Sequence, residues 1–231
     1  MRRTFYLAGV NRKGLAAAAS PVEYWLLSFT LLRRQANGLP EWLHPYLTGR
    51  QVVWDPGTYA DRAVSYLDYR RFLDSIRGRG DPYLQYDEVG DADATGWYLR
   101  DMRRRGYEPI PVLQPGGDVR LLEEPRVAIG GLVPMPPHQR QAYLDELFYG
   151  DGRMQPVGQV HLLGIVARQW FMRYPARSGD ATTWLPRSEW NRSRSIAEWL
   201  SAFGEQDVPF RPPGEIQAPL FARDKDRVRL S

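Results

Sequence analysis

Short apolar stretches alternate along the chain with longer stretches in which apolar and polar residues recur at helical spacing. The apolar stretches cover residues 4–10, 51–54, 82–87, 108–114, 126–131 and 157–164, and a seventh ends near residue 180. The longer stretches predict helices at residues 21–35, 64–77, 93–106, 136–150, 165–174 and 193–204. Strands that are apolar throughout, each followed by a helix, are typical of a parallel sheet covered on both faces.

This alternation predicts an α/β fold. The seven apolar stretches favour a compact, irregular (β/α)8 TIM-type barrel, formed by residues 1–210 as one catalytic domain. A doubly wound open sheet is the alternative. No eighth strand is evident, and residues 207–210 are the candidate for it. Residues 211–231 are rich in proline and then in charge, and we expect them to form a C-terminal tail.

Composition is that of a globular protein, since 43% of the 231 residues are hydrophobic and 25% are charged. All but two of the 31 basic residues are arginine, and the net charge of +4 is compatible with binding to nucleic acid. The apolar stretch at residues 22–32 is about half as long as a membrane crossing requires. We therefore expect a cytoplasmic protein with no membrane partner.

The chain contains no cysteine, which excludes a disulfide framework, cysteine-bound zinc and a thiol nucleophile. Its three histidines, His44, His138 and His161, are not spaced as the ligands of a metal. No glycine-rich phosphate-binding motif follows a predicted strand. The sequence thus predicts no cofactor and no metal, and His161, inside a predicted strand, is expected to be a packed core residue.

Polar residues and glycines stand where the predicted strands end. They are Asp55, Asp87, Gln114, the pair Gly130 and Gly131, and Asp180. Taken singly, such residues are typical of turns and helix caps. In a barrel, however, the carboxyl ends of all strands meet at one face, so we expect these residues to converge there.

Carboxylates grouped with an amide can perform glycosyl transfer without a metal. One carboxylate attacks an anomeric carbon to form a covalent intermediate, and a second transfers protons. An aspartate and a glutamine can also read guanine, because the carboxylate accepts its N–H groups and the amide donates to its carbonyl oxygen. Metal-assisted hydrolysis is the competing use of strand-end aspartates, but it commonly employs further histidines that this sequence lacks.

The order of these motifs resembles the tRNA-guanine transglycosylase superfamily. The series WDPG, QYDEV, PVLQPGG, AIGGLV, VHLLG and SGDATTW spans roughly residues 50–184 and follows the order of that family's signatures. EPIPVLQ, VAIGGLV and VHLLG are most similar to the branch of DNA-guanine transglycosylases. The tRNA enzymes carry a CxCxxC zinc subdomain, so the absence of cysteine also favours the DNA branch.

This resemblance implies roles for individual residues. Asp180 corresponds to the nucleophile that attacks C1′ of the nucleotide, and Asp55 to a residue that transfers protons. Asp87 and Gln114 correspond to the pair that reads the base. Backbone contacts to the edge of the base are implied for Gly130, Gly131 and Leu132. The implied reaction exchanges guanine in DNA for a 7-deazaguanine, such as 7-cyano-7-deazaguanine, through a covalent Asp–deoxyribose intermediate.

The expected partners are DNA with a flipped or single-stranded guanine, the free 7-deazaguanine base and companion DNA-modification proteins. Candidate phosphate contacts are Arg100, Arg103, Arg104, Arg105, Arg187, Arg192 and Arg194. Ser178 and Gly179 are expected to leave room for the sugar, and Trp184 is a candidate for shaping its pocket. Two alternatives stay open: a related enzyme that acts on tRNA, and a non-catalytic DNA-binding barrel.

Overall fold

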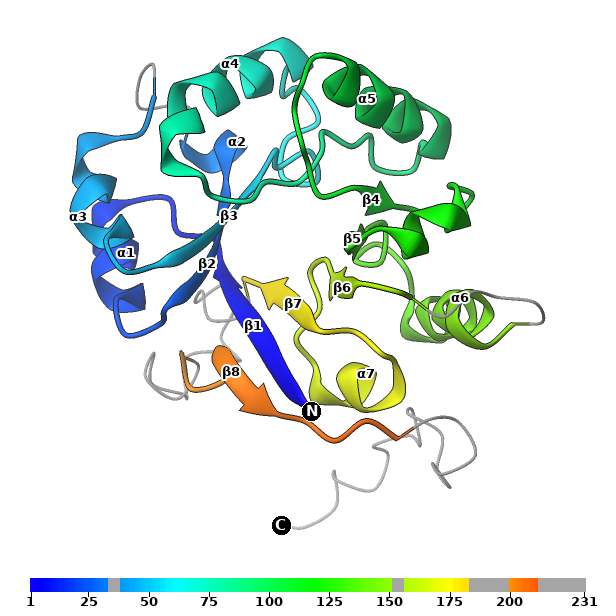
Figure 1. Cartoon of the computed structure of the whole chain (residues 1–231). Coiled ribbons are helices and arrows are strands. Elements are labelled where there is room, and N and C mark those ends of the chain that lie inside the picture. Colours follow the sequence, from blue (N-terminus) through cyan, green and yellow to red (C-terminus); the bar gives the residue numbers. More distant parts are fainter. Residues whose placement is uncertain (33–37, 151–155, 183–199, 212–231) are drawn as a thin grey trace.

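The computed structural model describes residues 1–32, 38–150, 156–182 and 200–211, and these form a mixed α/β fold around a curled parallel sheet (Figure 1). The sheet order is β3-β2-β1-β7-β6-β5-β4. Its parallel strands are β1 (Arg2–Ala8), β2 (Tyr24–Ser28), β3 (Gln51–Asp55), β4 (Val112–Leu113), β5 (Arg126–Ile129), β6 (Gln159–Leu162) and β7 (Ser178–Ala181). The predicted α/β class is confirmed.

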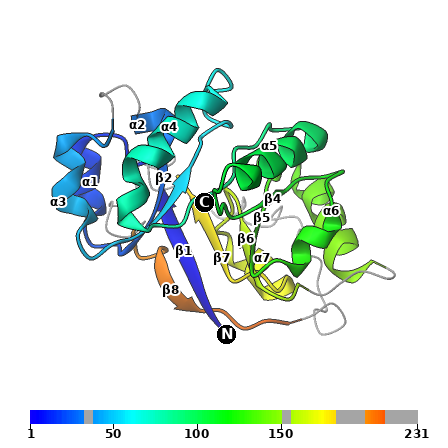
Figure 2. The same ribbon diagram turned by 45° about the horizontal axis from the view of Figure 1, so that its top comes forward.

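Helices surround the outside of the curled sheet (Figures 1 and 2). They are α1 (Lys13–Ala19), α2 (Phe29–Leu32), α3 (His44–Leu47), α4 (Tyr66–Ile76), α5 (Ala92–Arg104), α6 (Pro137–Tyr149) and α7 (Arg168–Arg173), with 3-10 turns η2 (Glu41–Leu43), η3 (Arg77–Arg79) and η4 (Val119–Glu123). α4 to α7 confirm four of the predicted helices, whereas most of the one predicted at residues 193–204 lies outside the described residues. No helix in the described ranges is long and apolar enough to cross a membrane.

The prediction of one helix over residues 21–35 is wrong. Residues Tyr24–Ser28 form β2, which pairs with β3 in the register Trp25↔Val52, and only the short α2 follows. Trp25, Leu26 and Leu27 are all buried, because β2 is covered on both faces. A strand buried on both faces has no polar alternation, so its sequence cannot be told from that of a buried helix.

Single β-bridges, and not a continuous strand, connect the region of β3 with the residues just before β4. Tyr83 bridges Trp54, and Leu84 bridges Ile110, both in the parallel sense. The Leu84 N–H donates to the Trp54 carbonyl at 2.8 Å, and the Ile110 N–H donates to the Tyr83 carbonyl at 2.8 Å. The strand predicted at residues 82–87 is therefore reduced to two bridging residues.

A further strand, β8 (Gly204–Asp207), pairs with the first half of β1. It runs antiparallel, with Arg2 opposite Asp207, whereas β2 pairs with the end of β1 at Leu7 and Ala8. The predicted eighth strand at residues 207–210 is thus wrong in position, apart from Asp207 itself. The expected tail is described only at Arg211.

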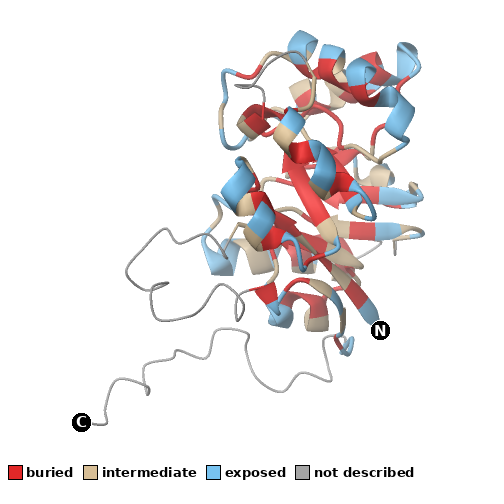
Figure 3. Ribbon diagram, turned by 90° about the vertical axis from the view of Figure 1, so that its left-hand side faces the viewer, coloured by how far each residue is buried: buried red, intermediate tan, exposed pale blue. Residues whose placement is uncertain are grey.

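Much of the sheet is buried (Figure 3), and its apolar residues form two buried clusters. The larger core lies between the sheet and the helices and includes Phe5, Trp54 and Phe171. A second, smaller core fills the concave side of the sheet and consists of Ala8, Leu26, Val53, Leu84, Val112 and Ala128, one from each neighbouring strand or bridge. Its members are small or medium in size, because the curl of the sheet brings the strands close together there.

Gly179 of β7 lies where the outer core leaves no room for a side chain. A Cβ built there would approach the Ile165 carbonyl oxygen to 2.1 Å and Phe171 Cζ to 2.6 Å. The expectation that Gly179 leaves space for a sugar is therefore wrong, since this position faces α7 and the loop before it.

We expect Gly179→Ala to destabilise the fold by about 2–3 kcal/mol, because the backbone oxygen of Ile165 cannot move away freely. Urea unfolding measures this change. Gly14→Ala is the matched control, because no atom lies within 4 Å of a Cβ at this position in α1 and the change should stabilise by up to about 1 kcal/mol. Equal stabilities of the two variants would contradict this description of the packing.

Candidate active site

The residues expected at strand ends do lie at the carboxyl ends of parallel strands. Asp55 is the last residue of β3, Gln114 follows β4 directly, and Gly130 follows β5 directly. Asp180 lies in β7, one residue before its end. Because the strands are parallel, these residues share one end of the sheet.

Asp87 and Gln114 form a buried hydrogen-bonded pair. Gln114 Nε2 donates to Asp87 Oδ2 at 3.2 Å, and its Oε1 accepts from the Gly90 N–H at 2.9 Å. The Thr58 hydroxyl donates to the other oxygen of Asp87, Oδ1, at 2.7 Å. Gln114 Nε2 also lies 3.2 Å from Thr95 Oγ1 on α5. Both side chains are therefore held in fixed orientations before any ligand arrives.

The glycine pair lies directly against Gln114. Gly131 has a φ of +71°, and a Cβ there would lie 3.1 Å from Pro115 Cδ and 3.8 Å from Gln114 Oε1. A Cβ on Gly130 would lie 2.8 Å from Val112 Cγ1. Leu132, the next residue, is buried, and its carbonyl accepts from Arg140 Nε at 3.0 Å. The pair thus lets neighbouring side chains pack closely against this stretch of backbone, beside the glutamine amide.

Asp180 has a histidine neighbour that is distant in sequence. His161 Nε2 lies 3.1 Å from Asp180 Oδ1, and His161 Nδ1 lies 2.9 Å from Ser178 Oγ. The Gly164 N–H donates to the same Asp180 oxygen at 2.8 Å. His161 was expected to be a packed core residue; it is largely buried, and both of its ring nitrogens have hydrogen-bond partners. Ser178, which was expected to leave room for a sugar, instead contacts the imidazole.

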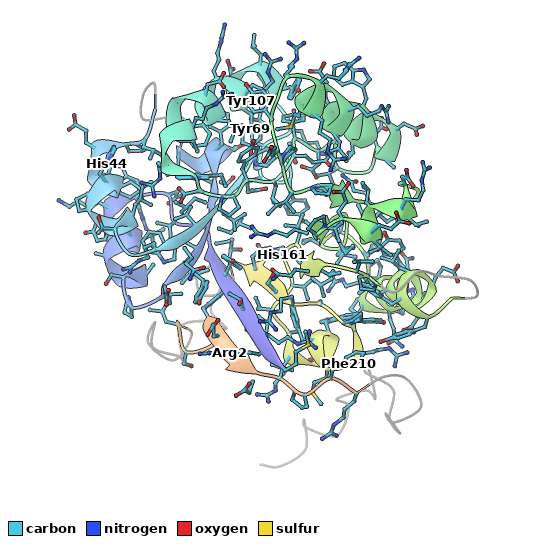
Figure 4. All side chains as sticks on the ribbon, in the orientation of Figure 1. Arg2, His44, Tyr69, Tyr107, His161 and Phe210 are labelled. Atoms are coloured by element: carbon cyan, nitrogen blue, oxygen red, sulfur yellow. The ribbon has the colours of Figure 1, made fainter. Side chains whose placement is uncertain are left out.

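The register between β6 and β7 brings His161 and Asp180 together. His161 pairs with Ser178, so the imidazole and the side chains of Ser178 and Asp180 share the concave face of the sheet. Figure 4 shows His161 inside the curve of the sheet. Its ring also meets the Tyr6 ring of β1 edge to face, with 5.7 Å between centroids. Three neighbouring strands thus fix the position of the imidazole.

The charge on Asp180 determines which histidine nitrogen carries a proton. An ionised carboxylate can only accept hydrogen bonds, so the contact with Asp180 requires a proton on His161 Nε2. In a neutral ring Nδ1 is then the acceptor, and the Ser178 hydroxyl can donate to it. Both described donors contact Oδ1, so neither of them engages Oδ2 of Asp180.

Burial and like charges raise the pKa of Asp55 and Asp87. Burial and, after it, the negative charges of Asp87 and Asp180 raise the pKa of Asp55 to about 8, against a hydrogen bond from the Gly57 N–H. Burial also raises the pKa of Asp87 to about 6, although the hydrogen bond from Thr58 opposes the shift. The charges of Asp87 and Asp180 both act on Asp55, as expected for carboxylates that share one site.

Those of the expected phosphate-binding arginines that the structure describes are not part of this cluster. Arg103 and Arg104 end α5 and pair with Glu124 at 2.9 Å and Asp101 at 3.2 Å, and Arg105 also pairs with Asp101. Arg103 borders a groove of about 840 Å³ together with Arg126, the first residue of β5, so it lies at the opposite end of the sheet. Arg100 is exposed on α5. Trp184, Arg187, Arg192 and Arg194 lie outside the described residues.

A second cavity lies behind the candidate site. It has a volume of about 480 Å³, and its lining includes Tyr6, Tyr24, Arg126, His161 and Ser178. The cavity occupies the end of the sheet where the strands begin. His161 therefore borders this cavity and also contacts Asp180 on the side of the strand ends.

The residues that sequence reasoning missed are those that orient the predicted ones. Thr58 and Thr95 hold the Asp87–Gln114 pair, whereas His161 and Gly164 hold Asp180. One signal was present in the sequence, because His161 is a titratable residue within a largely apolar strand. A buried titratable side chain in such a place needs a partner.

We expect Asp55→Asn to change the pH dependence of stability. With a folded-state pKa of about 8, Asp55 keeps its proton in the native state while the unfolded chain loses it above about pH 4. The wild type should therefore lose stability as the pH rises from 4 to 8. The variant has no carboxyl group at this position and should not show this loss. In urea unfolding, the free energy of unfolding of Asp55→Asn relative to the wild type should increase by about 2 kcal/mol or more between pH 4.5 and 8.5. Asp68→Asn, at an exposed position on α4, is the control, and an equal pH trend in both variants would contradict the assignment.

Comparison with known proteins adds no family assignment. No protein-family model matches the chain, and no curated protein matches it. Within the described residues, no three histidine, aspartate or glutamate side chains are grouped so that they could hold a metal ion. The geometry of the site and the order of the sequence motifs are the observations that bear on its chemistry.

Proposed function

We propose that this chain is a DNA-guanine transglycosylase that exchanges guanine in DNA for a 7-deazaguanine base, such as 7-cyano-7-deazaguanine. The observation that carries the proposal is the convergence of three aspartates with Gln114 at one end of the sheet. The order of the motifs in the sequence supports it. Each of these side chains has a distinct role in the reaction.

The Asp87–Gln114 pair would read the guanine edge. Each oxygen of an ionised Asp87 accepts one described hydrogen bond and keeps a lone pair for the ring N–H and the exocyclic amine of guanine. The two protons of Gln114 Nε2 are shared among Asp87, the Glu88 carbonyl and Thr95, so the amide would release one of these bonds to donate to the guanine carbonyl oxygen. The backbone at Gly130, Gly131 and Leu132 lies beside Gln114 and would contact the edge of the base. A 7-deazaguanine presents the same edge, so one site serves both bases.

Asp180 would be the nucleophile, because a carboxylate is already ionised near neutral pH and needs no base to activate it. Its Oδ2 forms a bond to C1′ as the C1′–N9 bond breaks, and the electron pair of that bond leaves with guanine. N9 of the incoming deazaguanine then attacks C1′, and the electron pair of the C1′–Oδ2 bond returns to Asp180. Two displacements restore the original configuration at C1′.

Asp55 would transfer the proton that balances these steps. With a pKa of about 8, it is largely protonated at neutral pH and can donate to the departing guanine. The resulting carboxylate can then accept the proton from the incoming base. Two carboxyl groups with separated pKa values are typical of such a division between acid and nucleophile.

The same proposal extends to the fold. The bridges at Tyr83 and Leu84 stand between β3 and β4, and we propose that they act as the missing strand of a (β/α)8-type barrel. The grouping of functional residues at the carboxyl ends of the strands supports this view. The polymer is proposed to be DNA because the sequence has no cysteine for the zinc subdomain of the tRNA enzymes. Its target guanine must be flipped or single-stranded to enter the site, with companion proteins as candidates for opening the duplex.

We expect Asp180→Asn to abolish guanine exchange, because an amide does not form the sugar ester. Incorporation of labelled guanine into DNA and trapping of a protein–DNA adduct on a denaturing gel measure the two effects. Asp68→Asn, at an exposed position on α4, should leave both unchanged. Exchange that persists in Asp180→Asn would contradict the assignment of the nucleophile.

The same assay separates the alternatives. Exchange on tRNA and not on DNA would place the chain with the RNA-acting enzymes. Affinity for DNA that falls steeply with salt, without any exchange, would indicate a non-catalytic DNA-binding protein. Mass spectrometry of nucleosides, after incubation of DNA with the protein and 7-cyano-7-deazaguanine, identifies the inserted base.

We expect a bell-shaped dependence of the exchange rate on pH, between about 6 and 8. Below pH 6, Asp87 becomes protonated and loses acceptors for guanine, so kcat/KM should fall about tenfold per pH unit. Above pH 8, Asp55 loses the proton that it donates. Asp55→Glu is expected to move the upper limb and leave the lower one unchanged. A rate that does not depend on pH from 5 to 9 would contradict both roles.

A further inference from the structure

Neither the sequence motifs nor the proposed roles assign a task to His161. Its side chain is only 12% exposed, and that of Asp180 is 10% exposed. The imidazole connects Asp180 Oδ1 at 3.1 Å with Ser178 Oγ at 2.9 Å. A buried imidazole with partners on both nitrogens has one fixed orientation, and here that orientation points Nε2 at the proposed nucleophile.

We propose that His161 is the positioning residue of Asp180: its Nε2–H holds Oδ1, so that Oδ2 faces the sugar, and it stabilises the carboxylate each time Asp180 leaves C1′. This inference rests on the proposed transglycosylase function. His161 acts through Asp180 and does not itself touch the substrate.

The backbone supports the same arrangement. The Gly164 N–H is the second donor to Oδ1, at 2.8 Å, and Gly164 has a φ of +72°. A Cβ at Gly164 would lie 2.2 Å from Val133 Cγ2, so this close turn excludes larger residues. Two donors from the β6 region therefore hold one carboxylate oxygen, Oδ1, and neither of these two donors contacts Oδ2.

The effect of the donor follows from the charge on Asp180. A free carboxylate carries a full negative charge, whereas the oxygens of its sugar ester carry much less. A hydrogen bond from His161 therefore stabilises the free carboxylate more than the ester. When the donor is removed, the equilibrium between free enzyme and covalent adduct should shift toward the adduct. A net stabilisation of about 1.4 kcal/mol from a charge-assisted hydrogen bond corresponds to an about tenfold change in the ratio of adduct to free enzyme.

The variants His161→Phe and His161→Gln separate this role from simple packing. Phenylalanine keeps a ring of similar size and has no nitrogen, whereas glutamine retains an N–H donor. His138→Gln, at an exposed position on α6, is the matched control. The fraction of protein in the covalent adduct is measured at pH 7.5 with excess single-stranded DNA and a fixed concentration of free guanine. The KM for free guanine is measured in parallel.

We expect His161→Phe to raise the ratio of adduct to free enzyme about tenfold and to lower kcat. The KM for guanine should change less than twofold, because Asp87 and Gln114 are intact. His161→Gln should return the ratio to near the wild-type value. A loss of adduct and exchange together in both variants would overturn the proposal, since that pattern indicates only a structural role.

Nitrogen NMR of the histidine ring tests the contact without any assay of activity. We expect Nε2 of His161 to carry a proton in the wild type, and its chemical shift to change in Asp180→Asn. A ring that is protonated only on Nδ1 would overturn the proposal, and so would a shift that is the same in Asp180→Asn. If His161→Phe does not fold, His161→Gln and this measurement decide the matter.

Different results would contradict the proposed function and the proposed role of His161. If the wild type exchanges guanine in neither DNA nor tRNA, the proposed function is wrong. In that case the NMR result alone decides whether His161 positions Asp180. If exchange occurs but the adduct ratio is unchanged in His161→Phe, the function stands and the role of His161 is wrong.

Discussion

The pairing of β6 with β7 is the constraint on which the candidate site depends. Its register places His161 opposite Ser178 and thereby sets the imidazole beside Asp180. A shift of one residue would turn His161 to the outer face, because side chains alternate along a strand. The packing of Gly179 against α7 and the preceding loop resists such a shift, because that position has no room for a side chain. The outer core thus fixes the chemistry of the concave face.

The grouped carboxylates reduce the stability of the fold. Burial and neighbouring negative charges raise the pKa of Asp55 and Asp87, so each of them lowers stability as the pH rises above the pKa of the unfolded chain. Hydrogen bonds from Thr58 and Gln114 offset part of this cost at Asp87, and one from the Gly57 N–H does so at Asp55. Apolar side chains at these buried positions would stabilise the fold more than carboxylates do. A cluster of buried carboxylates with raised pKa values is therefore typical of a functional site.

Several features could be read from the sequence because they depend on local pattern. Continuous apolar stretches followed by amphipathic ones indicated parallel strands and the helices α4 to α7. The positions of Asp55, Gln114 and Asp180 at strand ends followed from where those stretches stop. β2 was mistaken for a helix because Trp25 to Leu27 are buried on both faces, and burial on both faces erases the periodicity that separates the two structures.

The sequence by itself determined which residues stand at the ends of the strands and that no cysteine is present for a zinc subdomain. The tertiary structure alone decided which side chains meet. His161 and Asp180 are 19 residues apart, and nothing in their local sequence specifies the register that joins them. The pKa values of the aspartates are likewise a tertiary property, because they depend on burial and on charges carried by other strands. A strand pattern gives the direction of a side chain, but only packing gives its neighbour.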